Sequence, residues 1–205
     1  MTRKEILKLI FVNPFEKVAG WQAFGIGLVF VILTAFVGSC NGAYFDGALD
    51  VHSTGKAYPF WVAILMLFID LASIIMVFLL AGLVFSRKFR VADVCGTMFL
   101  AKAPTLFIAL VMFLPMPELE SMSKEGIESF IESLSVLPMM LSLIAIVLAT
   151  IAIIVWTFAL FYNAYKVSLN IKKNGVIIFI AAILIAEILS IILLKVFLNV
   201  SQFSL

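Results

Sequence analysis

The feature that most constrains the fold is a set of five long apolar stretches separated by short polar segments. A helix needs roughly 20 apolar residues to cross a bilayer core about 30 Å thick. The stretches that meet this length are 21–40, 60–85, 95–114, 138–163 and 175–198. Helices suit the bilayer because they satisfy their backbone hydrogen bonds internally. The sequence therefore predicts an all-α, polytopic membrane protein, with one transmembrane domain formed by a bundle of five transmembrane helices.

Composition excludes the main soluble alternatives. Of the 205 residues, 64% are hydrophobic and 13% are charged, with a mean hydropathy of +1.22. A soluble domain carries about a quarter charged residues, so this composition argues against an ordinary soluble enzyme or a disordered tail. The basic residues form no stripe, so we expect no nucleic-acid partner. The apolar stretches also lack the period-two alternation of transmembrane barrel strands.

Basic residues predict the orientation, because short cytoplasmic loops carry an excess of Lys and Arg. One side of the predicted bundle holds ten of them: Arg3, Lys4, Lys8, Lys17, Arg87, Lys88, Arg90, Lys166, Lys172 and Lys173. The other side holds Lys56 and Lys124. We therefore expect a cytoplasmic N-terminus and an external C-terminus. The expected location is the cell membrane, which is the cytoplasmic (inner) membrane in a bacterium.

Two segments outside the spans have amphipathic patterns. Residues 1–20 read as a cytoplasmic segment with a basic helix over 3–12, followed by a helix restart with Asn13 as N-cap and Pro14 at the first helical position. Residues 115–137 read as an acidic outer loop with a short interfacial helix. Each segment is expected to lie at a membrane surface.

The two cysteines are predicted to lie at opposite ends of the bundle. Cys40 ends the first span on the outer side and Cys95 begins the third on the inner side, which is too far apart for a disulfide. We interpret both as small buried apolar residues. An alternative is that Cys40 closes a lipoprotein-like cleavage box and is lipidated.

No catalytic motif is evident. The sequence contains no GxSxG, HExxH or phosphate-binding glycine loop, so we expect no enzyme activity, no cofactor and no metal. Asp46, Asp50 and His52 form a trio of residue types that can bind a metal. Their irregular spacing in a glycine-bearing loop favours a solvated loop instead.

Four charged residues fall inside the predicted spans. Lys195 lies close to the outer end of its span and is expected to snorkel, and the other three, Asp70, Lys102 and Glu187, define the candidate site. Asp70 lies about 15 Å from the outer end of its span and Glu187 about 18 Å from the inner end of its span, at 1.5 Å per residue. A charge at mid-bilayer costs at least roughly 2.5–3.5 kcal/mol, so each should face the bundle or have a partner. Lys102 is placed to reach Asp70 or to snorkel inward.

Two interpretations of these three residues remain open. They form either an ion or proton path, or a structural ion pair that fixes helix packing, and the structural interpretation is favoured. Transporters usually show broken helices or repeats at their sites, and no Gly/Pro break is evident beside Asp70 or Glu187. Small-residue pairs suited to helix packing are Ala23/Gly27, Ala35/Ser39, Ala145/Ala149 and Ala182/Ala186.

Several short motifs together resemble the Yip family, membrane proteins named for their interaction with Ypt/Rab GTPases. They are Asn13-Pro14-Phe15, Arg90-Val91-Ala92-Asp93, Ala101-Lys102-Ala103-Pro104, and Trp156 with Leu160 and Tyr165-Lys166. The five-span topology also matches that family. The chain is similar to the short prokaryotic members, because it lacks the long N-terminal domain and the DLYGP-like stretch of eukaryotic ones, so Rab binding is not carried over.

The resemblance implies a helical scaffold that acts through protein or lipid partners. It also marks Asp93 and Pro104 as motif residues of unspecified role, which fit an N-cap and a kink of the third span. We therefore expect a non-enzymatic protein of membrane organisation or trafficking, with the lipid bilayer and a membrane-protein partner or second copy as its contacts. The alternatives are a small ion- or proton-coupled transporter or permease component, and an accessory subunit of a larger complex.

Overall fold

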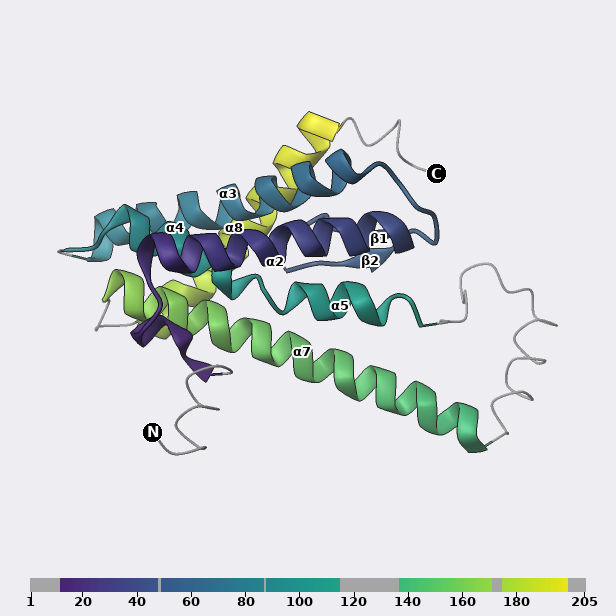
Figure 1. Cartoon of the computed structure of the whole chain (residues 1–205). Coiled ribbons are helices and arrows are strands. Elements are labelled where there is room, and N and C mark those ends of the chain that lie inside the picture. Colours follow the sequence, from purple (N-terminus) through teal and green to yellow (C-terminus); the bar gives the residue numbers. More distant parts are fainter. Residues whose placement is uncertain (1–11, 48, 87, 115–136, 171–174, 199–205) are drawn as a thin grey trace.

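The computed structural model describes residues 12–47, 49–86, 88–114, 137–170 and 175–198. Over these ranges the chain is almost entirely helical, with one two-stranded hairpin (Figure 1). In chain order the elements are η2 (Pro14–Glu16), α2 (Gly20–Asn41), β1 (Ala43–Tyr44), β2 (His52–Ser53), α3 (Phe60–Phe85), α4 (Val91–Ala101), α5 (Thr105–Val111), α7 (Leu137–Leu169) and α8 (Gly175–Leu198).

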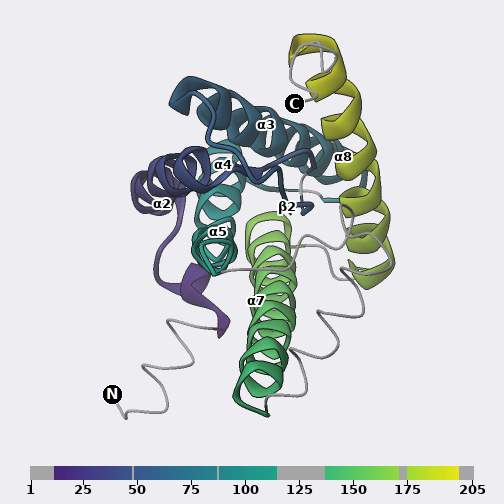
Figure 2. The same cartoon turned by 90° about the vertical axis from the view of Figure 1, so that its right-hand side faces the viewer.

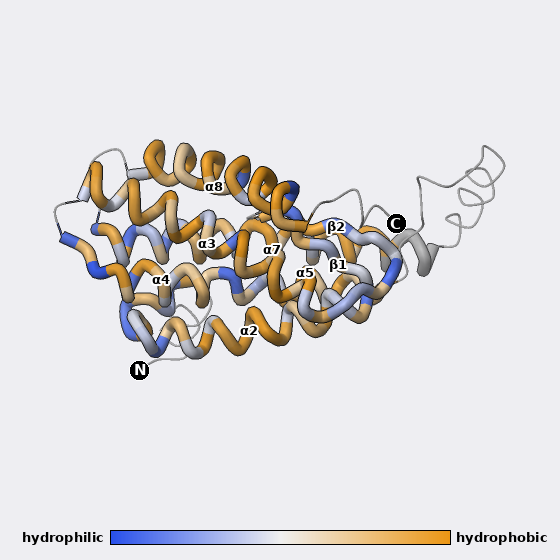
Figure 3. The backbone as a smooth tube through the Cα atoms, turned by 90° about the horizontal axis from the view of Figure 1, so that it is seen from above, coloured by the Kyte–Doolittle hydropathy of each residue, from blue (hydrophilic) through white to orange (hydrophobic). Residues whose placement is uncertain are grey.

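Five candidate membrane spans are present, which confirms the predicted fold class. They are α2, α3, α4 together with α5, α7 and α8, each long and apolar enough to cross a bilayer. The observed bounds of α3 and α8 coincide with the predicted spans. Figure 3 shows that hydrophobic residues dominate the helices along their length. Many of these side chains are exposed, as expected for surfaces that face lipid. The chain is a multi-pass membrane protein.

The third and fourth spans are longer than the hydropathy pattern predicted. The third span begins at Val91, four residues early, with Arg90 as N-cap. The prediction that Asp93 is the N-cap was therefore wrong: Asp93 lies in the first helical turn, where the helix dipole stabilises an acidic side chain. The fourth helix continues to Leu169 because Tyr165 and Leu169 are buried against the bundle.

The expectations for the segments outside the spans have mixed outcomes. Most of the expected amphipathic helix at 3–12 and of the acidic loop at 115–137 lies outside the described residues. The restart at Pro14 is a short 3-10 turn, and the Asn13 side chain makes no capping bond to the backbone. Its amide nitrogen instead donates to Glu16 Oε1 at 2.8 Å.

Two tightly packed helix pairs form the centre of the bundle, α2 with α4 and α3 with α8. Glycine permits the closest approach between α2 and α4. A Cβ at Gly27 would overlap the backbone of Phe99, and one at Gly96 would overlap the Gly20 carbonyl. In a membrane no hydrophobic effect drives helices together, because lipid tails are also apolar. Association therefore depends on close van der Waals packing, which small residues permit.

The fourth span is placed differently from the other four. α7 packs mainly on α4, and towards its N-terminal end it diverges from the bundle (Figures 1 and 2). Three of the four predicted small-residue pairs are buried within the bundle, namely Ala23/Gly27, Ala35/Ser39 and Ala182/Ala186. The fourth pair, Ala145/Ala149 on α7, is exposed.

A short hairpin inserts between the helices at the end of the bundle where α2 ends and α3 begins. β1 pairs antiparallel with β2, and Tyr44 is opposite His52. The connecting loop 45–51 carries Phe45, which is fully buried against Gly38. The segment is buried only in part. Phe45 and Gly47 are buried, whereas Asp50 and His52 are exposed, as expected of the predicted solvated loop. Irregular backbone can lie among transmembrane helices only where the protein buries it or water reaches it.

The cysteines are both free, and Cys40 is exposed while Cys95 is half-buried. They lie near opposite ends of the bundle, at the end of α2 and near the start of α4. The expectation that both are buried apolar residues is wrong for Cys40, because its side chain points out of the packed helices.

Candidate functional site

The third span is broken in the middle, and the break forms the base of the candidate site. α4 ends at Ala101 and α5 begins at Thr105. Pro104 has no N–H and its ring would clash with the carbonyl four residues earlier, so a regular helix cannot pass through it. The expected kink at Pro104 is present as a stretch of turn over residues 102–104, in which backbone hydrogen bonds such as Thr105 N–H to the Lys102 carbonyl replace the regular helical pattern. Our expectation of no Gly/Pro break beside Asp70 was wrong, because Lys102 extends from this break to Asp70.

Asp70 is held by side chains from two other segments. The carboxylate is fully buried near the middle of α3. Lys102 Nζ lies 3.3 Å from Asp70 Oδ2, so of the two expected positions of this side chain, the structure has the one that reaches Asp70. Ser190 Oγ on α8 donates to Asp70 Oδ1 at 2.5 Å. These contacts join α3, the helix break and α8 at one point.

Glu187 lies near this group but bonds to a different partner. Its Oε2 accepts a hydrogen bond from the Leu49 backbone N–H at 2.9 Å, and the side chain fills the space beside Gly47. Glu187 still interacts electrostatically with Asp70 and Lys102. The three predicted residues therefore form one polar region, in which Asp70 and Lys102 pair directly and Glu187 anchors the hairpin loop.

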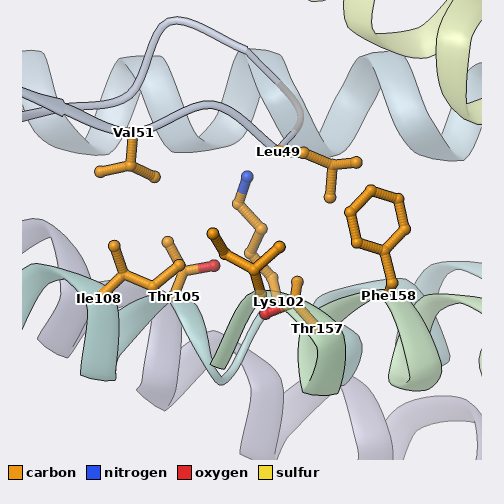
Figure 4. Close-up of a pocket in the computed structure, with 8 residues that line it drawn as sticks. Leu49, Val51, Lys102, Thr105, Ile108, Thr157 and Phe158 are labelled. Carbon is orange, nitrogen blue, oxygen red and sulfur yellow. The ribbon is translucent and has the colours of Figure 1, made fainter. Parts of the chain in front are cut away.

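A small cavity lies beside Lys102, between the hairpin loop, α5 and α7. Figure 4 shows the Lys102 side chain rising from the helix break towards the loop. The cavity volume is about 20 Å³, which is room for about one water molecule. Its lining is mostly apolar, with hydroxyls from two threonines: Leu49, Val51, Lys102, Thr105, Ile108, Ile154, Thr157 and Phe158.

The burial of the Asp70 and Lys102 charges has an energetic cost that their contacts must offset. Moving two charges out of water costs several kcal/mol per ion, and the penalty is offset only by close contact and additional hydrogen bonds. Asp70 has both, through Lys102 and Ser190. The described arrangement is thus a closed, internally satisfied ion pair, with Lys102 only 3% exposed.

Sequence reasoning missed Ser190 and the hairpin loop. Ser190 follows Glu187 by three residues in an otherwise apolar helix, and residues three apart share a helix face. That spacing was the available signal that Ser190 lies on the same face of the helix as Glu187. The loop carries Phe45, Leu49 and Val51, and these apolar residues were the signal that part of it packs against the helices.

The family-motif positions have local structural roles. Pro104 is the N-cap of α5 and follows the end of α4 by three residues. Asp93 lies against Gly20, with its Oδ1 3.2 Å from the position a Cβ would take there. Its backbone carbonyl accepts a hydrogen bond from Thr97 Oγ1 at 2.7 Å. Asp93 therefore helps to place the start of α4 against the start of α2.

The hairpin brings a second set of polar groups together. The ligand atoms of Asp46, Asp50 and His52 all lie within 4.8 Å of one another. Two tyrosines pack beside them: the Tyr44 ring lies 5.2 Å from the His52 ring, and Tyr58 packs edge-on against Tyr44. Burial, and secondarily the charge of Asp46, raises the pKa of Tyr44 above its ordinary value of 10.

Comparison with known proteins adds no functional assignment. No family model, curated protein or solved structure matches the chain. Function is therefore inferred from the geometry of the described residues and from the sequence motifs.

Proposed function

We propose that the chain is a non-enzymatic membrane protein of the Yip type, which organises protein or lipid partners within the bilayer. The observation that carries this proposal is the closure of the interior polar site. Asp70 is fully buried and bonded to both Lys102 and Ser190, and the cavity beside Lys102 has room for about one water molecule. Among the described residues, these charges hold α3, α8 and the helix break together, and the cavity beside Lys102 is too small for an organic substrate.

The exposed face of α7 supports action through a partner. A partner helix approaches closely where small residues line the contact, and Ala145 and Ala149 offer such a position on a helix that diverges from the bundle. We propose that this face contacts a membrane-protein partner, with lipid covering the rest of the apolar surface. The proposed orientation places the N-terminus in the cytoplasm, because the basic residues gather on that side.

Native mass spectrometry of protein extracted in a mild detergent tests the proposal. We expect the wild-type chain to retain a stoichiometric protein partner or a bound lipid. The double variant Ala145→Leu/Ala149→Leu should lose a protein partner, because the larger side chains block close helix approach. Ala181→Leu, at an exposed alanine on α8, is the matched control and should retain it. A wild-type chain free of protein and lipid would contradict the proposal.

A second candidate function is a small ion- or proton-coupled transporter. One observation favours it: the helix break at Lys102–Pro104 lies beside a buried carboxylate, and broken helices form the ion sites of many transporters. Proton flux into proteoliposomes distinguishes the two functions. If the wild-type protein gives no flux above the protein-free level, and Asp70→Asn/Glu187→Gln lowers thermal stability without changing flux, transport is excluded. Wild-type flux above that level, abolished in a stably folded double variant, would support transport instead.

A further inference from the structure

The hairpin loop presents three metal-binding groups at one point. Asp46 lies two residues after β1 and His52 is the first residue of β2. Because the two strands pair, His52 Nδ1 lies 3.1 Å from Asp46 Oδ1. Asp50 reaches the same point from within the loop, so the three ligand atoms lie within 4.8 Å of one another. The donors are one imidazole nitrogen and two carboxylate oxygens, a set that suits divalent transition metals such as Zn²⁺.

The local charge is strongly negative beyond this trio. The Glu187 carboxyl carbon lies 2.8 Å, and Asp50 Cβ 3.2 Å, from the position that a Cβ on Gly47 would occupy. Asp46 and Asp50 both act electrostatically on Glu187. Among the described residues, Lys102 acts electrostatically on Glu187, but its ammonium group pairs with Asp70. A divalent cation at the hairpin would offset the remaining repulsion between the carboxylates.

The loop is held in place by contacts outside the trio, so the donors are positioned before a metal binds. Tyr58 donates a hydrogen bond to the Ala43 carbonyl at the base of β1. Tyr44 packs against the imidazole of His52 and limits its rotation. The Leu49 N–H bonds to Glu187. A preorganised set loses less conformational entropy when it binds a ligand.

We propose that Asp46, Asp50 and His52 form a binding site for a divalent transition-metal cation, with Zn²⁺ as the reference ion. Ligand atoms around one Zn²⁺ ion lie about 2 Å from the metal, so the three side chains need to close in by only about 1 Å. Water completes the coordination. This site is independent of the proposed function, because it depends on the hairpin and not on a partner.

Direct binding measurements test the site. Full-length protein without a polyhistidine tag is reconstituted in nanodiscs and titrated with Zn²⁺ in competition with a chromogenic chelator. We expect one equivalent to bind. His52→Ala and Asp46→Asn/Asp50→Asn should each weaken affinity about tenfold or more. Glu16→Gln removes an exposed carboxylate remote from the hairpin and should leave affinity unchanged.

A spectroscopic measurement on the wild-type protein removes any dependence on variant folding. X-ray absorption of the zinc-loaded protein should show nitrogen and oxygen neighbours, including one imidazole. A sulfur-dominated shell, which would place the metal at a cysteine, overturns the proposal. So does the absence of saturable Zn²⁺ binding, or binding that His52→Ala and the double aspartate variant leave unchanged.

Discussion

Lys102 Nζ lies 3.3 Å from Asp70 Oδ2 in the interior of the bundle, and both side chains are buried. The lysine extends from the break between α4 and α5, and the aspartate lies near the middle of α3. The long lysine side chain spans the distance from this break to the carboxylate on α3. The two charges thereby connect an irregular segment to a regular helix.

Ser190 should contribute to stability through its bond to Asp70. Ser190→Ala removes a hydrogen bond to a carboxylate, which costs about 1.5–3 kcal/mol. Ser168→Ala is the matched control, because the buried Ser168 hydroxyl has no hydrogen-bond partner among the described residues, so its loss should cost nothing. Reversible unfolding in mixed micelles measures the free energy of unfolding of each variant. Equal effects of the two substitutions would show that the Ser190 bond is not formed.

The close approach of α2 and α4 depends on Gly27. A Cβ at this position would overlap the Phe99 backbone, so Gly27→Ala should destabilise the protein by about 1–3 kcal/mol through overpacking. On the same helix, a Cβ at Gly25 meets nothing within 4 Å, and Gly25→Ala should be neutral or slightly stabilising. Thermal unfolding measures the stability of the two variants relative to the wild type. A Gly27→Ala variant as stable as Gly25→Ala would contradict the described helix contact.

The hairpin should be sensitive to high pH through Tyr58. Burial, and secondarily the nearby Tyr44, raises the pKa of Tyr58 above its ordinary value of 10. A raised pKa in the folded state adds stability that is complete below pH 10 and is lost as the pH rises beyond it. The difference in unfolding free energy between wild type and Tyr58→Phe should therefore stay constant up to pH 10 and then shrink. A difference that grows above pH 10 would contradict this environment.

Much of the architecture followed from the sequence because apolar length alone identifies a membrane span. The bounds of α3 and α8 were predicted directly. The contact of Lys102 with Asp70 was one of two expected positions of the lysine side chain. The start of α4 was not, because Asp93 reads as the end of a polar loop in a hydropathy pattern. A helix tolerates an acid in its first turn, so the boundary lay four residues earlier.

The candidate site was predicted in part. Glu187 was expected beside Asp70 and Lys102, but its hydrogen bond goes to Leu49. No local pattern predicts that contact, because it joins residues far apart in the chain and requires the hairpin to insert between helices. The third partner of the site, Ser190, is a single polar residue in an apolar helix, and its role depends on which face of α8 meets α3.

A double-mutant cycle on Lys102 and Asp70 tests most directly whether the interior site holds the bundle together. Lys102→Met leaves a buried charge unpaired, which costs about 3–5 kcal/mol. Asp70→Asn should also destabilise, and the double variant should cost clearly less than the sum of the two singles, by more than about 1 kcal/mol. Lys166→Met, at an exposed lysine on α7, should have little effect. Strictly additive single effects, measured by reversible unfolding in mixed micelles, would contradict the account of a structural ion pair.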